Sequence, residues 1–118
     1  MPHEPYHTIT PRMIVQDVAG AAHFLRDVFD AVGEVPADRP AELQIGDSLV
    51  MVSQAGEREL FPALLYIYVC DADRVYAKAL DAGAVSIESP QDVPWGDRRA
   101  IVRDPYGNVF QIAHRRDD

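Results

Sequence analysis

Residues 100–114, AIVRDPYGNVFQIAH, consist of two apolar runs separated by a short polar segment. Pro105 and Gly107 lie in that segment, and a chain reversal needs such residues for its fixed φ and its positive φ. The stretch therefore predicts two strands, residues 100–103 and 109–114, joined by a tight turn at residues 104–108.

Upstream of this strand pair, one order of elements occurs twice. An apolar run that predicts a strand, residues 10–15 or 64–69, leads into an aspartate, Asp17 or Asp71, that can cap a helix. Apolar residues then recur at spacings of three and four, which is typical of one face of a helix. The apolar residues of the two helices are Ala21, Ala22, Leu25, Val28, Phe29 and Val32, and then Val75, Tyr76, Ala79 and Leu80.

Each predicted helix is followed by a glycine and then by short strands. Gly33 and Gly83 are expected to end the helices. In the first half, strands at residues 41–45 and 49–53 flank a hairpin turn at residues 46–48. Both halves thus have the order of a strand, a helix and two or three strands, and the sequence predicts an internal duplication.

We expect a single domain over residues 1–118. Its first module would occupy residues 9–53 and its second module residues 63–114. Residues 54–62 begin with polar residues and contain Gly56, so they are expected to link the modules. A module of about 55 residues buries too little surface to fold alone, so the two modules should share one core.

The composition excludes several classes of protein. The chain has 118 residues, of which 47% are hydrophobic and 25% are charged, which is typical of a folded domain. Acidic residues outnumber basic residues by 19 to 11, for a net charge of −8. Because that charge repels a phosphate backbone, we expect no nucleic acid partner. No apolar run reaches the roughly 20 residues of a bilayer span, so we expect no membrane partner.

The two faces of the first strand in each half differ. Alternation places aliphatic residues of the strand 64–69 on one side, where a helix can cover them, and hydroxyl-bearing aromatic residues on the other. The first side holds Leu65, Ile67 and Val69, and the second side holds Leu64, Tyr66 and Tyr68; in the first half, Pro11, Met13 and Val15 lie opposite Thr10, Arg12 and Ile14. Either the second side lines a cavity, or it packs as ordinary core with each tyrosine hydroxyl reaching a surface partner.

These residues resemble a known family. The paired order of elements, IGDSL at residues 45–49 and PWGDRRAIVRDPYGNVFQIAH at residues 94–114 are similar to the vicinal oxygen chelate superfamily. That superfamily groups glyoxalase I, bleomycin-resistance proteins and extradiol dioxygenases. The most specific piece is RDPYGN at residues 103–108, followed by Gln111, where the family commonly reads R-D-P-x-G-N-x-x-E. The resemblance covers residues 10–114.

The resemblance implies an α+β fold. In that fold, paired βαβββ modules form a curled mixed sheet around a cavity, with the helices on the outer face. A pair of chains often completes two such cavities, so we expect a homodimer, with or without exchange of modules between its chains. The same scaffold serves enzymes and binding proteins, so the fold alone does not decide the function.

The positions of the family's metal ligands are informative. In metal-dependent relatives, four ligands, usually histidines and a glutamate, come from the first and last strands of the two halves. The equivalent positions here are Thr10, Leu64, Gln111 and either Val50 or Met51. A divalent cation needs about three or four carboxylate, thiolate or imidazole donors, which this set does not supply. We therefore expect no metal and no other cofactor.

Other catalytic groups are scarce. The sequence contains no nucleophile elbow, Walker A loop or dinucleotide-binding fingerprint. The single cysteine, Cys70, follows an apolar run, so we expect a buried structural thiol. A lone cysteine also favours a reducing compartment and hence a cytoplasmic protein. Glu42, which alternates with Gln44, is the best candidate for a buried acid or base, unless that strand face is solvated.

Residues 92–99, DVPWGDRR, contain the single tryptophan, Trp95. In relatives this segment borders the cavity mouth, so Trp95 would stack on a planar or cationic ligand. Alternatively, Trp95 covers the sheet edge or a dimer interface. Arg98 and Arg99 alternate across the start of a strand, so one can point inward toward an anion or a carbonyl while the other pairs with an acid such as Asp97.

We therefore predict a metal-free small-molecule-binding protein, similar to bleomycin-type antibiotic-binding proteins, that sequesters a planar or cationic compound. The alternative is a lyase, isomerase or dioxygenase on the same scaffold, which would use a metal, or acid–base catalysis by Glu42 with Arg12 as an electrophile. A third class is an interaction domain that uses the sheet edge alone. No catalytic residue is predicted, and the predicted ligand-binding residues are Thr10, Arg12, Tyr66, Tyr68, Trp95, Arg98 and Gln111.

Overall fold

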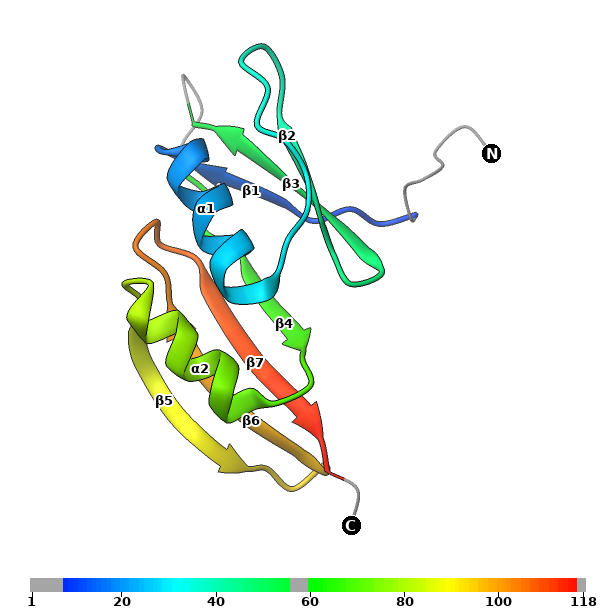
Figure 1. Ribbon diagram of the computed structural model, residues 1–118, viewed down its shortest axis with the longest axis vertical. Coiled ribbons are helices and arrows are strands. Elements are labelled where there is room, and N and C mark those ends of the chain that lie inside the picture. Colours follow the sequence, from blue (N-terminus) through cyan, green and yellow to red (C-terminus); the bar gives the residue numbers. More distant parts are fainter. Residues whose placement is uncertain (1–7, 56–59, 117–118) are drawn as a thin grey trace.

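The computed structural model describes residues 8–55 and 60–116, which form two mixed sheets and two helices (Figure 1). In chain order the elements are β1 (Arg12–Val15), α1 (Val18–Phe29), β2 (Ala41–Ile45), β3 (Ser48–Gln54), β4 (Leu64–Tyr68), α2 (Ala72–Asp81), β5 (Val85–Asp92), β6 (Asp97–Arg103) and β7 (Val109–Arg115). The three-stranded sheet has the order β1-β3-β2 and the four-stranded sheet has the order β4-β7-β6-β5. β1 runs parallel to β3, and β4 runs parallel to β7. The other neighbouring strands are antiparallel. The predicted α+β class is confirmed.

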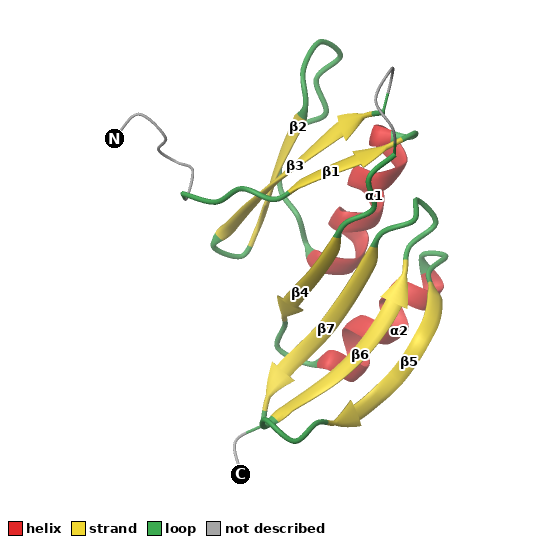
Figure 2. Cartoon of the chain, turned by 180° about the vertical axis from the view of Figure 1, so that it is seen from behind, coloured by secondary structure: helices red, strands yellow, loops and turns green. Residues whose placement is uncertain are grey.

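Both helices lie on the same side of the sheets. The view from behind shows the sheets in front of the helices, so that the opposite, helix-free face is turned to the viewer (Figure 2). The two sheets follow one another along the long axis of the molecule and do not close around a hollow (Figure 1). An isolated antiparallel bridge between Ile14 and Phe61 connects β1 to the segment that leads into β4.

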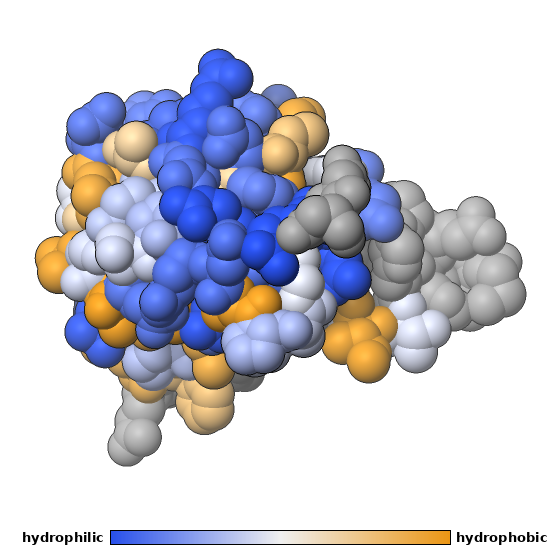
Figure 3. All heavy atoms as spheres, turned by 90° about the horizontal axis from the view of Figure 1, so that it is seen from below, coloured by the Kyte–Doolittle hydropathy of each residue, from blue (hydrophilic) through white to orange (hydrophobic). Residues whose placement is uncertain are grey.

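The surface agrees with the charged composition. Seen from the end of the molecule nearest the C-terminus, hydrophilic residues cover most of the surface and hydrophobic residues form small separate patches (Figure 3). Neither α1 nor α2 has the length and apolar character of a membrane-spanning helix.

The first half departs from the predicted pattern after its helix. α1 ends at Phe29 because Asp30 adopts a left-handed conformation with φ of 58°, so the helix stops before Gly33, which was expected to end it. Val32, predicted on the apolar side of the helix, lies beyond its end and is 71% exposed. An isolated bridge between Val32 and Gln44 stands where a further strand of the module would lie.

The second half contains a strand that the apolar pattern does not predict. β5 has the sequence VSIESPQD, in which Pro90 and several polar residues hide any alternation. It pairs with β6 at the edge of the four-stranded sheet, with register shifts around Glu88. Proline is tolerated in a sheet at such an edge, because no neighbouring strand needs its missing N–H.

The predicted helix caps are confirmed. The side chain of Asp17 accepts a hydrogen bond from the N–H of Gly20 at 2.9 Å, and that of Asp71 accepts one from the N–H of Arg74 at 3.2 Å. Each carboxylate thereby satisfies a backbone donor that has no partner within the first turn of its helix. A Cβ at Gly20 would lie 2.5 Å from the hydroxyl of Tyr106, so the absence of a side chain lets the turn after β6 approach α1.

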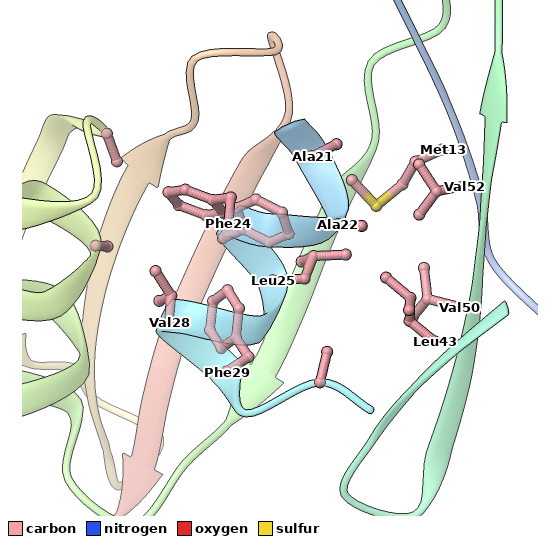
Figure 4. Packing of buried hydrophobic residues seen from close by; sticks show 14 of the residues in the cluster. Met13, Ala21, Ala22, Phe24, Leu25, Val28, Phe29, Leu43, Val50 and Val52 are labelled. Atoms are coloured by element: carbon pink, nitrogen blue, oxygen red, sulfur yellow. The ribbon is translucent and has the colours of Figure 1, made fainter. Parts of the chain in front are cut away.

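Helix α1 packs against both sheets. Its buried residues point in two directions: Leu25 lies toward Met13 and Val52 of the three-stranded sheet, whereas Phe24 points toward the other half (Figure 4). On that side, Phe110 of β7 is fully buried, and its ring centroid lies 5.9 Å from that of Phe24 and 5.3 Å from that of Phe29. The two halves therefore share one core, with α1 at its centre.

The turn between β6 and β7 is held by two buried polar side chains. Oδ1 of Asp104 accepts hydrogen bonds from the N–H groups of Tyr106 (2.9 Å) and Asn108 (2.8 Å). The side chain of Asn108 donates to Oδ2 of Asp104 (3.1 Å), and its oxygen accepts from the N–H of Ala63 (3.0 Å). Burial raises the pKa of Asp104, although these hydrogen bonds oppose the increase. The aspartate and asparagine of the RDPYGN motif thus close the turn and tie it to the start of β4.

We expect Asn108→Ala to lower the free energy of unfolding by about 2–3 kcal/mol, because it leaves the N–H of Ala63 and Oδ2 of Asp104 without their hydrogen-bond partner. Urea unfolding followed by circular dichroism measures the change. The control is Arg103→Ala, which removes an exposed side chain next to the same turn and should change the free energy by less than about 0.5 kcal/mol. Equal effects of the two variants would show that the asparagine does not hold the turn.

Candidate functional site

The helix-free face of the four-stranded sheet carries a group of aromatic side chains. In β4, Leu65 and Ile67 pack toward the core, so Tyr66 and Tyr68 point the other way and are 37% and 57% exposed, as the alternation predicts. Their ring centroids are 5.3 Å apart. Because β7 lies between β4 and β6, residues of all three strands meet on this face. We call Tyr66, Tyr68, Trp95, Asp97, Arg99 and Arg115 the tyrosine cluster.

Asp97 lies at the centre of the tyrosine cluster and is fully buried. Its Oδ2 accepts hydrogen bonds from the hydroxyls of Tyr66 (2.7 Å) and Tyr68 (2.8 Å). Its Oδ1 accepts a hydrogen bond from Nη1 of Arg115 at 2.9 Å. A buried carboxylate is tolerated when it is paired and hydrogen-bonded in this way. The same bonds fix the positions of two exposed aromatic rings.

The bonds within the tyrosine cluster also decide which groups are ionised. Exclusion of water from Asp97 opposes its charge, but the hydrogen bonds from both tyrosines and the charge of Arg115 hold the pKa of Asp97 below its usual value. Loss of water, followed by the hydrogen bond to Asp97, raises the pKa of Tyr66. The hydrogen bond to Asp97, followed by loss of water, raises the pKa of Tyr68. At neutral pH the aspartate is therefore charged and both tyrosines keep their protons.

Trp95 extends this aromatic surface. Its indole Nε1 donates to the hydroxyl oxygen of Tyr66 over a long distance of 3.4 Å, and its side chain is 54% exposed. The guanidinium carbon of Arg99 lies 5.3 Å from the centroid of the indole ring, within the range of a cation–π interaction. Nη2 of Arg99 also donates to Oε1 of Glu88 at 3.1 Å.

The structure brings four of the predicted ligand-binding residues together. Tyr66, Tyr68 and Trp95 belong to the tyrosine cluster, and Gln111 of β7 is the register partner of Tyr66. Because partners in register point to the same face of a sheet, the side chain of Gln111 lies beside the cluster.

Arg98, also in the predicted set, lies apart from the tyrosine cluster. It points to the helix side of the sheet, where Nε and Nη2 donate to Asp73 of α2 at 2.6 and 3.0 Å and Nη1 donates to Asp92 at 3.2 Å. These two carboxylates raise the pKa of Arg98 further above its usual value. The position on the tyrosine face belongs to Arg99 instead. Ala100, which is buried in the core, could have indicated this arrangement. Successive residues of a strand point to opposite faces, so Arg99 must point away from the core and Arg98 toward the helix side.

Two further predicted residues lie on the other sheet. Thr10 precedes β1, and Arg12 within β1 donates from Nε to Oγ of Ser53 at 2.8 Å. Neither residue belongs to the four-stranded sheet that carries the tyrosine cluster. Val50 is buried toward the core, so Met51, which pairs with Arg12 and Glu42, is the residue of β3 on the helix-free face.

The family's metal positions do not fit a divalent cation. The side chains there are a hydroxyl, a thioether, an alkyl group and an amide, from Thr10, Met51, Leu64 and Gln111. Leu64 is 66% exposed on the strand of the tyrosine cluster, and it offers no donor atom. Within residues 8–55 and 60–116, no three side chains of His, Cys, Asp or Glu come together in a way that could hold a metal ion.

A cleft of about 740 Å³ lies between the two halves. Its walls come from the end of α1, the hairpin between β2 and β3, strand β4 and the start of α2. Among the predicted ligand-binding residues, Tyr66 and Tyr68 contribute to its lining. Cys70 also lines the cleft and is exposed, so the prediction of a buried thiol is wrong. The residue lies in the bend after β4, beyond the part of the strand that the core covers.

Asp97, Arg99 and Arg115 are members of the cluster that the sequence did not assign to the site. Asp97 was expected to pair with Arg98 or Arg99, but its ion pair is with Arg115. Its bonds to Tyr66 and Tyr68 depend on how β4, β7 and β6 are ordered in the sheet. No local pattern contains that information.

Comparisons with known proteins agree with this architecture. TioX from Micromonospora sp. ML1 superimposes with a TM-score of 0.78 and 26% identity, covering 92% of this chain and 98% of TioX. A glyoxalase/bleomycin resistance protein/dioxygenase family enzyme from Burkholderia phytofirmans PsJN superimposes with a TM-score of 0.77 and 21% identity, covering 89% and 95% of the two chains. This second likeness concerns the fold alone.

Sequence comparison gives the same result. "Uncharacterized protein Mb0911c" of Mycobacterium bovis (strain ATCC BAA-935 / AF2122/97) is 32% identical in an alignment of 122 residues. The alignment covers 88% of this chain and 80% of the relative. The family model described as Glyoxalase/Bleomycin resistance protein/Dioxygenase superfamily matches residues 7–112. With nearly the whole chain matched, and with the fold that the resemblance implies, the chain belongs to the glyoxalase/bleomycin resistance protein/dioxygenase superfamily.

Proposed function

We propose that this protein binds a planar, partly apolar small molecule on the helix-free face of its four-stranded sheet. The tyrosine cluster carries the proposal. Tyr66, Tyr68 and Trp95 expose aromatic rings side by side, and a buried carboxylate fixes two of them. Exposed aromatic groups held rigidly in this way bind flat ligands at a low entropic cost. Gln111 adds an amide that can donate to or accept from the ligand.

The proposed binding requires no metal and no chemical step. The ligand positions of the metal-dependent relatives hold Thr10, Met51, Leu64 and Gln111, which supports a binding role over a metal-dependent reaction. Sequestration of an antibiotic-like compound is the role that we propose. The net charge of −8 would draw positively charged compounds toward the protein. A free thiol at Cys70 fits the cytoplasm as the location of this activity.

We further propose that the protein acts as a homodimer. In one chain, Arg12 stands on the helix-free face of the three-stranded sheet and Thr10 precedes β1 of that sheet, so both lie away from the tyrosine cluster. A second copy whose three-stranded sheet faces this four-stranded sheet, with or without exchanged modules, would enclose a hollow between the two. Such an arrangement would bring all the predicted residues except Arg98 to one ligand.

An acid–base enzyme is the second candidate, and one observation favours it. Arg12 of β1 and Glu42 of β2 are both register partners of Met51, so they flank that residue on the helix-free face. A carboxylate and a guanidinium in this relation can move a proton and polarise a carbonyl. Elemental analysis of the purified protein would separate a metal-dependent form of this alternative from metal-free binding.

The binding proposal predicts that bleomycin and the planar cation ethidium quench the fluorescence of Trp95, the single tryptophan, in a saturable way. In the double variant Tyr66→Phe/Tyr68→Phe, we expect the dissociation constants to rise about tenfold, because hydroxyl contacts to the ligand are lost. Fluorescence titration measures the wild-type constants, and calorimetry measures them independently.

The matched control for this titration is Tyr76→Phe. The hydroxyl of Tyr76 belongs to α2 and donates to Ser86, away from the tyrosine cluster, so its removal should leave the dissociation constants unchanged. The absence of saturable quenching with both compounds would count against the proposed function. Equal losses in the control and the double variant would place the binding elsewhere.

The tyrosine cluster also predicts a pH dependence. Because the pKa values of Tyr66 and Tyr68 are raised in the folded protein, their contribution to stability is present below about pH 10 and lost as the pH rises through the folded values. The contribution of Asp97, whose pKa is lowered, is present above about pH 4 and lost as the pH falls through its folded value.

In Asp97→Asn, we expect Tyr66 and Tyr68 to ionise at lower pH than in the wild type, since the negative charge that opposes tyrosinate is gone. Tyrosinate absorbance, measured as a function of pH on protein shown to be folded by circular dichroism, records the change. Asp92→Asn, which removes a carboxylate bound to Arg98 and Arg116, serves as the control and should leave the curve unchanged. Identical curves for wild type and Asp97→Asn would contradict the assigned bonds.

A further inference from the structure

The hydroxyl protons of Tyr66 and Tyr68 are both used within the protein. A tyrosine hydroxyl has one proton to donate and two lone pairs that accept. Both protons point to the same atom, Oδ2 of Asp97, at 2.7 and 2.8 Å. Neither hydroxyl can therefore donate to a ligand without breaking a bond to a buried carboxylate.

The reverse arrangement, in which Asp97 carries the proton, is disfavoured by its surroundings. Arg115 donates to Oδ1 of the same carboxyl group at 2.9 Å, and this cation favours the charged form. A carboxylate flanked by an arginine and two hydroxyls accepts all three hydrogen bonds. The direction of the tyrosine protons is thus fixed by the charge at the centre of the cluster.

Each tyrosine oxygen keeps accepting capacity on the open face. Trp95 donates to the oxygen of Tyr66 and takes one of its lone pairs. Arg115 lies beside the hydroxyl of Tyr68 and can take one there. One lone pair of each oxygen remains for a ligand, on tyrosines that are 37% and 57% exposed.

Arg99 would favour the opposite kind of ligand, but it is already engaged. Its Nη2 donates to Glu88 at 3.1 Å, and its guanidinium lies over the ring of Trp95. Although Nε of Arg99 has no acceptor among the described residues, that atom is covered from solvent, so a ligand would have to displace the side chain to reach it.

From this geometry we infer that the tyrosine cluster selects ligands that donate a hydrogen bond, through an N–H, O–H or ammonium group placed between the oxygens of Tyr66 and Tyr68 and beside the Trp95 ring. The inference rests on the proposed function and specifies the chemistry of its ligand. A planar molecule that offers only acceptors at that point would meet two oxygens with no proton to give, at the cost of an unsatisfied polar contact.

Two uncharged bicyclic probes test this selectivity. Indole presents one N–H donor in its plane, whereas quinoline presents one nitrogen acceptor, and both are neutral at pH 8, so the net charge of the protein does not bias the comparison. The single tryptophan gives one indole N–H signal in a spectrum of ¹⁵N-labelled protein, and that group lies 3.4 Å from the oxygen of Tyr66. Unlabelled probes contribute no signal of their own.

We expect indole to shift the Trp95 signal with a dissociation constant about tenfold lower than that of quinoline, the ratio that corresponds to one hydrogen bond of typical strength. In Asp97→Asn, an amide replaces the carboxylate and can donate to the tyrosine oxygens, which frees hydroxyl protons for the ligand. The preference for indole should then disappear or reverse. In Tyr66→Phe/Tyr68→Phe, which removes both acceptor oxygens and keeps both aromatic rings, the two probes should bind equally.

The outcomes separate the inference from the function on which it rests. Quinoline binding as tightly as indole to the wild type overturns the inferred selectivity but leaves ligand binding at Trp95 in place. A preference for indole that persists in Tyr66→Phe/Tyr68→Phe also overturns it, since the tyrosine oxygens would then not be the acceptors. If neither probe moves the Trp95 signal, both the inference and the proposed function fail.

Discussion

The burial of α1 against two different sheets is the contact on which the rest of the molecule depends. Leu25 faces the three-stranded sheet, while Phe24 and Phe29 contact Phe110 of the four-stranded sheet. An amphipathic helix with one narrow apolar stripe could cover one of these sheets but not both. Because a single helix serves two surfaces, the halves share a core although their strands do not form one continuous sheet.

This packing leaves the opposite face of the four-stranded sheet free of helices, and a buried charge organises that face. Asp97 has no solvent contact, yet it is ionised because two hydroxyls and a guanidinium replace the water that it loses. Such a group adds little stability compared with an apolar residue of similar size, but it specifies the positions of its partners. Here those partners are aromatic side chains that solvent would otherwise leave in several rotamers.

The local features of the fold could be predicted from the sequence because local forces determine them. The caps at Asp17 and Asp71 follow from the need of a helix terminus for an acceptor, and the two faces of β4 follow from the pleat. The end of α1 could not be predicted, because Asp30, three residues before the glycine, already takes the left-handed conformation that ends the helix.

Features that depend on the order of the strands could not be predicted from the sequence. The choice between Arg98 and Arg99 required the register of β6, and the role of Asp97 required β4 to lie two strands away from it. The exposure of Cys70 depends on where the core stops covering the end of β4, which no apolar run records. The sequence could therefore identify candidate residues on the correct strands, but it could not identify the side chains that bind them.

The side chain of Asn108 accepts from the N–H of Ala63, one residue before β4 begins, and Tyr66 then pairs with Gln111. Side chains of a strand alternate with a period of two, so one residue inserted between Ala63 and Leu65 would turn both tyrosines into the core and expose Leu65 and Ile67 to water. The number of residues from Ala63 to Tyr66 is therefore as constrained as the side chains that they carry. A side chain on this surface can be exchanged without moving its neighbours, whereas a chain one residue longer or shorter at this point would turn the whole strand over.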